Sequence, residues 1–297
     1  MHPENYRAEN HSADVCQAAN AMLARHLGSN QIAGDVLGRI GALEVRLASS
    51  GEDVRAAQRL RYDVFRHELG LQAHSAVGQI DADGYDEACD HLIVVDTDFA
   101  GKAGRRIVGT YRLLRQDKIH LSGGFYSESE FELSQLAARH PGLRFVELGR
   151  SCVLPDYRSK RTIELLWQGI WAYLNRHGID VMVGCASFRG TVPALHAEAL
   201  SYLAAHCRAS GDWSIRAVGD RYHTMDLMPV EAINPRSALG ALPPLIKGYL
   251  RVGAKVGDGC VIDREFGTVD VFMVMPVKDI GTRYINYYGG DGQKLVA

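Results

Sequence analysis

The sequence predicts an α+β domain of roughly 240 residues, built around a mixed sheet. Short apolar or alternating runs of strand length recur along the chain, and segments with helical periodicity separate them. Apolar residues make up 46% of the 297 residues, which is enough to build a core and excludes wholesale disorder. The chain contains no internal repeat and no low-complexity tract.

The first regular elements begin near residue 43. Residues 43–48 alternate apolar and polar side chains, which is the period of a half-buried strand. A helix is expected over residues 51–69, because Glu52 and Asp53 place negative charge in its first turn and favour the helix dipole.

The middle of the chain continues as strands and connections. We expect strands at 91–96, 106–114 and 145–154, with a partly helical stretch at 117–140. Residues 155–161 form a basic loop that leads into the next helix.

That helix has the clearest amphipathic pattern in the chain. Gly178 is expected to end it, because glycine readily takes the left-handed conformation of a helix C-terminus. Its apolar side chains follow the i, i+3, i+4, i+7 spacing and are Ile163, Leu166, Trp167, Ile170, Trp171 and Leu174.

For the last third of the chain, the sequence predicts one strand covered on both faces, two helices and a final strand. Residues 179–186 are almost uninterruptedly apolar, as in a strand that is covered on both faces. Helices are expected at 193–208 and 244–254, and a last strand at 268–276.

We expect two parts in the chain. Residues 1–40 are interpreted as an N-terminal extension that contains a short helix at 14–27. The domain then covers 41–297 and includes a C-terminal extension from about residue 230.

Charge and hydropathy limit the possible partners. The 33 Lys and Arg against 35 Asp and Glu give a net charge of −2, which argues against a generic nucleic-acid binder. No apolar run approaches the roughly 18 residues of a spanning helix, and the polar N-terminus lacks a secretory signal. We therefore expect a cytoplasmic, water-soluble chain, with peripheral contact at the inner membrane left open.

The cysteines predict neither a metal site nor disulfides. The six thiols are scattered, without a Cys-x-x-Cys pair, and several lie inside apolar runs. We expect buried thiols that act as small hydrophobic side chains.

Two candidate sites lie in the first half. Arg61, Phe65 and Glu68 share one stripe of the first helix, either as a solvated Arg–Glu face with Phe65 in the core or as part of a site. Residues 81–98 hold seven acids and no Lys or Arg, which indicates either a solvated loop or recognition of a cationic amine.

Two further candidates lie around the strand at 145–154. Glu147 and Arg150 interrupt an apolar run, so they either form a structural ion pair or line a functional cleft. The loop at 157–161 precedes a helix N-terminus, which makes it an anion site or an ordinary basic turn.

The segment 153–166 resembles the acyl-donor motif of the GCN5-related N-acyltransferase (GNAT) superfamily. Ser159 and Arg161 stand where that motif commonly has glycines, whose backbone approaches a pyrophosphate closely. The resemblance implies a mainly antiparallel sheet flanked by helices, and a donor on the phosphopantetheine of an acidic acyl carrier protein rather than coenzyme A. The implied donor-binding residues are Tyr157, Arg158, Ser159, Lys160, Arg161 and Thr162.

Further motifs resemble the acyl-homoserine-lactone-synthase-like branch of this superfamily. The tryptophan that this branch places after the first helix is absent, with Leu71 near that position. The matching residues are Arg61 and Phe65 (R-x-x-x-F), Asp83 and Asp86 (D-x-x-D), Arg112 (G-x-x-R-L-L), and Glu147 and Arg150 (E-x-x-R).

Within this branch the chain is most similar to the bacterial L-ornithine Nα-acyltransferases, with late motifs at 243–251 and 263–270. This resemblance implies transfer of a 3-hydroxyacyl chain from acyl carrier protein to the α-amine of L-ornithine, giving lyso-ornithine lipid, without a further cofactor.

The resemblance also implies a chemical role for each site residue. The expected catalytic residues are Glu147, Arg150, Ser151 and Cys152. Glu147 is expected to act as general base, and the backbone N–H groups near Ser151 and Cys152 to stabilise the oxyanion. Arg112 or Arg150 is expected to hold the ornithine carboxylate. The expected acceptor-binding residues are Arg61, Phe65, Asp83, Asp86 and Arg112, with Asp83 or Asp86 on the δ-ammonium group.

Two other functions stay open from the sequence. One is an acyl-homoserine-lactone-synthase-like acyltransferase with another amino-acid acceptor. The other is a protein without catalytic activity that binds a lipid or a carrier protein on the same fold.

Overall fold

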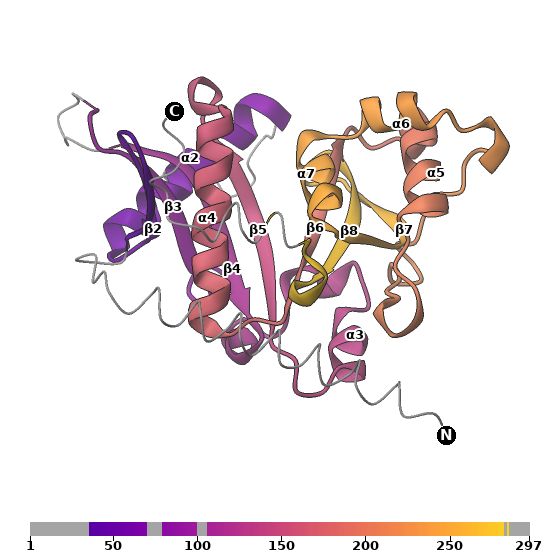
Figure 1. Cartoon of the computed structure of the whole chain (residues 1–297), viewed down its shortest axis with the longest axis horizontal. Helices are drawn as coiled ribbons and strands as arrows, with labels where there is room; N and C mark the ends of the chain where they lie inside the picture. Colours follow the sequence, from indigo (N-terminus) through magenta and orange to yellow (C-terminus); the bar gives the residue numbers. More distant parts are fainter. Residues whose placement is uncertain (1–35, 70–78, 100–105, 282–283, 285–297) are drawn as a thin grey trace, which may run out of the picture. The chain divides into compact units, whose positions relative to one another are not determined.

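The computed structural model describes residues 36–69, 79–99, 106–281 and 284, without the side chains of 67–69 (Figure 1). The described residues from Leu37 onward form one compact unit. The helix expected at 14–27, Cys16, Leu71 and the side chain of Glu68 lie outside the described residues. The boundary expected at residue 40 stays a prediction.

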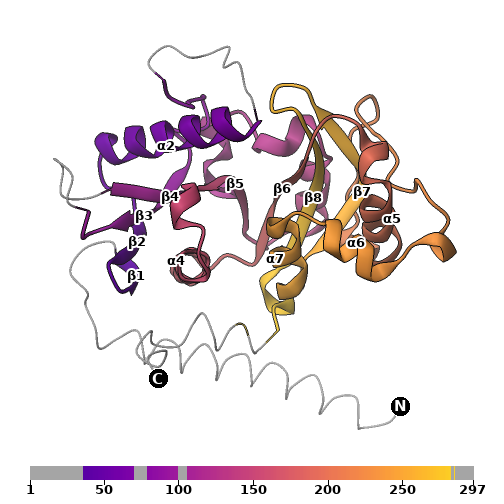
Figure 2. The ribbon, with the colours of Figure 1, turned by 90° about the horizontal axis from the view of Figure 1, so that it is seen from above.

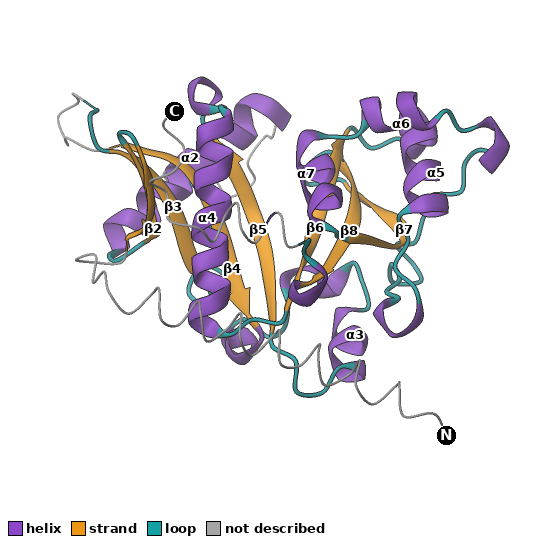
Figure 3. Cartoon of the chain, in the orientation of Figure 1, coloured by secondary structure: helices purple, strands orange, loops and turns teal. Residues whose placement is uncertain are grey.

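An eight-stranded sheet with the order β1-β2-β3-β4-β5-β6-β8-β7 forms the centre of the fold (Figure 3). From β2 to β7 every neighbouring pair is antiparallel except β5 and β6, which confirms the mixed, mainly antiparallel sheet. The strands are β1 (Val36–Ile40), β2 (Leu43–Leu47), β3 (Asp90–Asp96), β4 (Arg106–Arg115), β5 (Phe145–Val153), β6 (Val181–Arg189), β7 (Lys255–Asp263) and β8 (Thr268–Pro276).

Helices cover both faces of this sheet, and Figure 2 shows α2 and α4 on opposite faces of β3, β4 and β5. The α-helices are α2 (Gly51–Leu69), α3 (Leu133–Arg139), α4 (Lys160–His177), α5 (Ala197–His206), α6 (Pro235–Ala241) and α7 (Pro244–Val252). The 3₁₀ helices are η1 (Gln116–Leu121), η2 (Tyr126–Ser129), η3 (Pro155–Tyr157), η4 (Pro193–His196), η5 (Gly211–Trp213), η6 (Val230–Ala232) and η7 (Val277–Asp279).

Most of the expected elements form, with some differences in extent. The basic loop is shorter than predicted, because Ser159 caps α4 and places Lys160 and Arg161 in its first turn. The helix expected at 193–208 divides into η4 and α5. Strands β1 and β7 and helix α6 were not predicted.

The segment after residue 230 completes the sheet rather than forming an appendage. Strand β8 lies between β6 and β7, and all nine of its residues are buried. A strand with both faces covered reads as a continuous apolar run, which explains why its position was predictable while that of the more polar β7 was not.

The pairing of β5 with β6 creates the opening that the site uses. These strands pair only from Phe145 with Val181 to Glu147 with Val183, and their ladder ends there. At Gly184 the backbone takes a φ of +155°, and a Cβ atom there would lie 2.3 Å from the carbonyl oxygen of Leu148. Glycine is therefore required where the two strands begin to separate.

Within the described ranges, none of the helices combines the length and apolar character needed to cross a lipid bilayer.

Candidate active site

A cavity of about 440 Å³ lies where β5 and β6 separate. Residues 147–151 of β5 and 185–187 of β6 form two of its walls, and the first residues of α7 contribute an apolar side. Glu147, Arg150 and Ser151, three of the four residues expected to be catalytic, line this cavity together.

A β-bulge shapes the β5 wall. Gly149 pairs with Arg112 and Cys152 pairs with Thr110, so two residues of β5 stand opposite one residue of β4. One of the two, Arg150, has a φ of +50°, which is uncommon for a residue with a side chain.

The thiol of Cys152 faces away from the cavity. Its side chain is buried against Leu60 and Val64 of α2. Any contribution of Cys152 to catalysis would therefore come from its backbone, and this role stays a prediction. Among the described cysteines no disulfide is present, and Cys89 and Cys260 are buried as expected.

Glu147 is buried at the N-terminal end of η2. Its Oε2 atom accepts the backbone N–H of Tyr126 at 2.6 Å, and its Oε1 atom accepts that of Ser127 at 2.8 Å. The hydroxyl of Ser127 also donates to Oε1. Burial raises the pKa of the Glu147 carboxyl group, and these donors partly oppose that shift.

Arg61 is a buried ion-pair residue of α2. Its Nε atom lies 2.7 Å from Oδ2 of Asp81, and its Nη2 atom lies 2.9 Å from Oδ1 of Asp86. Asp86 also accepts a hydrogen bond from Gln58 at 3.0 Å. The side chain of Arg61 is only 1% exposed, which excludes the solvated Arg–Glu face.

Arg112 and Arg150 extend this network to the cavity wall. Nη1 of Arg112 lies 2.6 Å from Oδ1 of Asp83, and Nη2 of Arg150 lies 3.3 Å from Oδ2 of the same carboxylate. Arg150 also pairs with Asp81 at 3.2 Å and donates to the hydroxyl of Tyr126 at 3.0 Å.

The residues expected to bind the acceptor therefore divide into two groups. Phe65 and Arg112 line the cavity, whereas Arg61, Asp83 and Asp86 lie in the ion-pair network outside its lining. With Asp81, Arg112 and Arg150, this network contains three arginines and three aspartates, so its formal charges balance. Arginine side chains already neutralise the carboxylates of Asp83 and Asp86. Binding of an ammonium group by either residue therefore stays a prediction.

The expected donor-binding segment is held by local hydrogen bonds, and none of its residues lines the cavity. The hydroxyl of Tyr157 donates to Asp96 at 2.7 Å, and the guanidinium of Arg158 donates to the carbonyl oxygen of Val153 at 3.0 Å. Oγ of Ser159 accepts the N–H of Thr162 at 3.3 Å, and the Thr162 side chain is buried.

Two cationic side chains of this segment face the solvent at the N-terminus of α4. Lys160 and Arg161 are exposed, and Lys160 lies 3.3 Å from Glu164 of the next turn. The first N–H groups of an α-helix have no intrahelical partner, so this end of α4 is suited to an anion.

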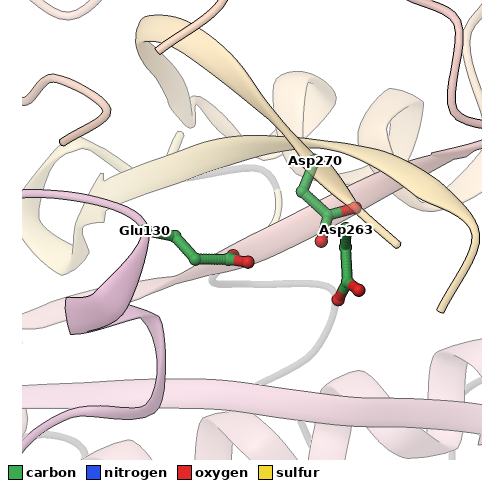
Figure 4. Close-up of side chains that lie close together, drawn as sticks. All are labelled: Glu130, Asp263 and Asp270. Atoms are coloured by element: carbon green, nitrogen blue, oxygen red, sulfur yellow. The ribbon is translucent and has the colours of Figure 1, made fainter. Parts of the chain in front are cut away.

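An acidic cluster that was not predicted from the sequence lies on the other side of the cavity. The carboxylates of Glu130, Asp263 and Asp270 point toward one another (Figure 4), with oxygens within 4.8 Å. Burial raises the pKa of Glu130 to about 7 and that of Asp270 to about 6. Asp270, an aspartate in the otherwise mostly apolar and fully buried β8, was the available signal, by the reasoning that singled out Glu147.

This fold and cavity define an acyltransferase of the GNAT class. Residues 60–168 match the family described as "Acetyltransferase (GNAT) domain". The chain is 55% identical to the L-ornithine N(alpha)-acyltransferase of Rhizobium meliloti (strain 1021) over 286 residues, 96% of each chain. It is 56% identical to that of Brucella abortus (strain 2308) over 263 residues, 88% of this chain and 94% of the relative.

The solved structure of FeeM, an N-acyl amino acid synthase from uncultured soil microbes, aligns with a TM-score of 0.47 and 11% identity, covering 80% of this chain and 92% of FeeM. The two near-full-length relatives show that the chain belongs to the L-ornithine N(alpha)-acyltransferase family, and the protein is an N-acyltransferase.

Proposed function

We propose that this protein transfers a 3-hydroxyacyl chain from acyl carrier protein to the α-amine of L-ornithine. The observation that carries the acceptor is the identity above 50%, over nearly the whole chain, to relatives named for this acceptor. The cavity beside the bulge supplies the matching chemistry, because Glu147, Arg112 and Arg150 are among the residues that line it.

The reaction is an aminolysis of a thioester. The α-nitrogen of ornithine forms a bond to the thioester carbonyl carbon, and the carbon–sulfur bond of the phosphopantetheine breaks. The amine loses one proton, and the thiolate that leaves takes one up. An α-amino group titrates near 8, so most of it is protonated at neutral pH and a base must accept its proton.

Glu147 is the proposed base. Its carboxylate lines the cavity, while the N-terminal end of η2 holds both oxygens in place. A raised pKa makes a carboxylate a stronger proton acceptor, and burial supplies that shift here.

Oxyanion stabilisation is assigned to the bulge. The thioester oxygen gains negative charge in the tetrahedral intermediate, and backbone N–H groups near Ser151 and Cys152 lie beside the opening between β5 and β6. Because a bulge leaves one residue without a ladder partner, it frees backbone groups for a ligand.

The carboxylate of the acceptor is assigned to Arg150 or Arg112. Arg150 is held between the rings of Tyr126 and Phe266, with its Cζ atom 4.8 Å and 4.5 Å from their centroids. Because a guanidinium has five N–H donors, Arg150 keeps donors for a carboxylate after binding Asp81, Asp83 and Tyr126.

Acyl carrier protein is the proposed donor because of the surface at the N-terminus of α4. Lys160 and Arg161 are exposed there, and Ser159 and Arg161 carry side chains where a coenzyme A site favours glycine. An acidic carrier would be attracted to these cations.

The test is a reconstitution. The purified protein is mixed with 3-hydroxyacyl carrier protein or the matching coenzyme A thioester, and with ornithine, each common amino acid or S-adenosylmethionine. We expect mass spectrometry to detect Nα-acyl-ornithine, with a higher kcat/KM for the carrier-bound donor. A different acylated acceptor would overturn the acceptor, and comparable kcat/KM values for the two donors would overturn the carrier.

A further inference from the structure

Three acidic side chains from separate parts of the chain meet at one end of the cavity. Glu130 follows η2, Asp263 ends β7 and Asp270 lies in β8 (Figure 4). All three line the cavity that contains Glu147. The sheet brings together β7 and β8, whose register pairs Asp263 with Thr268.

Two buried polar atoms of this end of the cavity lack a well-aligned partner. Oδ1 of Asp270 and Oγ1 of Thr268 make no hydrogen bond of good geometry within the described part of the chain, although the hydroxyls of Thr268 and Ser187 lie close enough to the Asp270 carboxyl group to lower its pKa. The two side chains are 6% and 2% exposed, and both line the cavity. Buried polar atoms normally have partners, so this pair indicates a ligand that supplies hydrogen-bond donors.

The cluster also carries more negative than positive charge. Arg221 pairs with Oε1 of Glu130 at 2.9 Å. Neither Asp263 nor Asp270 forms an ion pair with Lys, Arg or His in the described ranges. The arginine–aspartate network on the opposite wall has balanced charges, whereas Glu130, Asp263 and Asp270 outnumber the two arginines near them, Arg221 and Arg189.

The cluster is connected to the proposed base by direct contacts. The thiol of Cys185 lies 3.3 Å from Oγ of Ser127 and 3.6 Å from Oε2 of Glu130. Ser127 in turn donates to Glu147. A molecule whose amine is near Glu147 can therefore place a second group toward the acidic cluster within the same cavity.

We propose that Glu130, Asp263 and Asp270, together with the hydroxyl of Thr268, bind the terminal ammonium group of a diamino acid acceptor. The inference rests on the proposed function and gives the side-chain specificity of its acceptor site. It assigns the δ-ammonium of ornithine to this cluster rather than to Asp83 or Asp86.

An ammonium group fits the available acceptors better than a divalent metal ion does. It has three N–H donors, and there are three carboxylates. Oδ1 of Asp263 already accepts the N–H groups of Glu265 and Phe266 at 2.7 and 2.9 Å, and Arg221 occupies one oxygen of Glu130. Fewer oxygens are then left than the six to eight that a calcium ion takes.

The test compares two acceptors that differ only in the terminal amine. L-Norvaline has the same carbon chain as L-ornithine and no δ-amine. We expect wild-type protein to prefer ornithine by about 10²–10⁴ in kcat/KM, because a site built for a polar group discriminates strongly against its absence.

The variant Asp270→Asn should reduce this preference by about 10–100-fold, since it removes a hydrogen bond to a charged group. Thr268→Val should reduce it less and serves as a second variant with a smaller change. The matched control is Glu231→Gln at an exposed site in η6, which should keep the wild-type preference. The preference is the ratio of the rates with ornithine and with norvaline, measured on the same sample. A partly unfolded variant therefore lowers both rates and leaves their ratio unchanged.

Three results would overturn the inference. One is an unchanged preference in both Asp270→Asn and Thr268→Val. Another is a wild type that uses norvaline as well as ornithine. The third is stoichiometric binding of Mg²⁺ or Ca²⁺ in calorimetry that Asp270→Asn abolishes. A wild type that acylates neither acceptor would instead contradict the proposed function, and calorimetry with ornithine and norvaline would then test the cluster directly.

Discussion

At the scale of single residues, three buried charged groups have different surroundings and therefore different expected roles. Glu147 receives three hydrogen bonds from η2, Arg61 is neutralised by two aspartates, and Asp270 keeps one oxygen without a well-aligned partner. Burial alone does not distinguish them. The three groups differ in the number and charge of their partners.

Replacing Glu147 with Gln should lower kcat by about 10²–10⁴, because the amide cannot accept the amine proton. Steady-state kinetics with circular dichroism of the folded variant would measure this effect. Turnover at the wild-type rate would remove Glu147 as the base. A decrease in stability without a decrease in kcat would assign it to positioning η2.

The substitution Arg61→Met should destabilise the protein by about 3–5 kcal/mol, because it leaves two arginines to balance three aspartates in a largely buried network. The matched control is Arg59→Met on the exposed side of α2, for which we expect a change within about 0.5 kcal/mol. Urea unfolding of both variants would test the assignment. If Arg61→Met instead unfolded like wild type and raised the KM for ornithine, Arg61 would belong to the acceptor site.

At the scale of elements, two features serve the proposed reaction. The separation of β5 from β6 opens the cavity, and the N-terminus of α4 offers a surface for the donor. The first depends on a glycine at the point where the ladder ends, and the second on Ser159 as the helix cap. Each can be altered without touching the proposed base.

Gly184→Ala should destabilise the fold by about 1–3 kcal/mol, since its Cβ would meet the carbonyl oxygen of Leu148 at 2.3 Å. The control is Gly149→Ala in β5, where a Cβ atom has open space and φ is not positive. Thermal melts of the two variants would give the comparison. Equal melting temperatures would show that the strand separation does not depend on this glycine.

Reversing Lys160 and Arg161 to Glu should raise the KM for the carrier-bound donor and flatten its dependence on salt. Both side chains are exposed, and their attraction to an acidic carrier weakens as the Debye length falls from about 10 Å at 0.1 M to about 3 Å at 1 M salt. The KM for ornithine should be nearly unchanged. Loss of ornithine affinity with an unchanged donor KM would place these residues in the acceptor site.

At the scale of the whole molecule, the acidic cluster makes folding stability depend on pH. The pKa of Glu130 is raised to about 7 and that of Asp270 to about 6, so the folded chain binds more protons than the unfolded chain in weak acid. The free energy of unfolding contributed by these groups therefore decreases as pH rises from about 4 to about 7, and it is constant above.

Asp270→Asn should remove part of this dependence. The free energy of unfolding of the variant minus that of wild type should increase by on the order of 1–3 kcal/mol between pH 5 and pH 8. Urea unfolding of both proteins across this range would measure the difference, in which other titrating groups cancel. Parallel curves for the two proteins would show that the pKa of Asp270 is not raised.

Most of the elements and their order could be predicted from the sequence, because hydrophobic periodicity is a local property, whereas β1, β7 and α6 were not predicted. The apolar runs of β6 and β8 and the amphipathic pattern of α4 needed no knowledge of their neighbours. Glu147 and Arg150 were also identified, since charged residues in a buried strand need a compensating partner or a cavity, and the family resemblance added Ser151.

The partners of these residues were decided by the tertiary structure. Asp83, Asp86 and Asp270 are all carboxylates that could bind an ammonium group, but arginines from α2, β4 and β5 neutralise the first two, whereas Asp270 lies with Glu130 and Asp263. Such pairing joins segments that are far apart in the chain, and local patterns carry no information on which of them meet. The sequence by itself therefore determined the acyltransferase fold and one wall of its cavity, whereas long-range packing decided where its uncompensated negative charge lies.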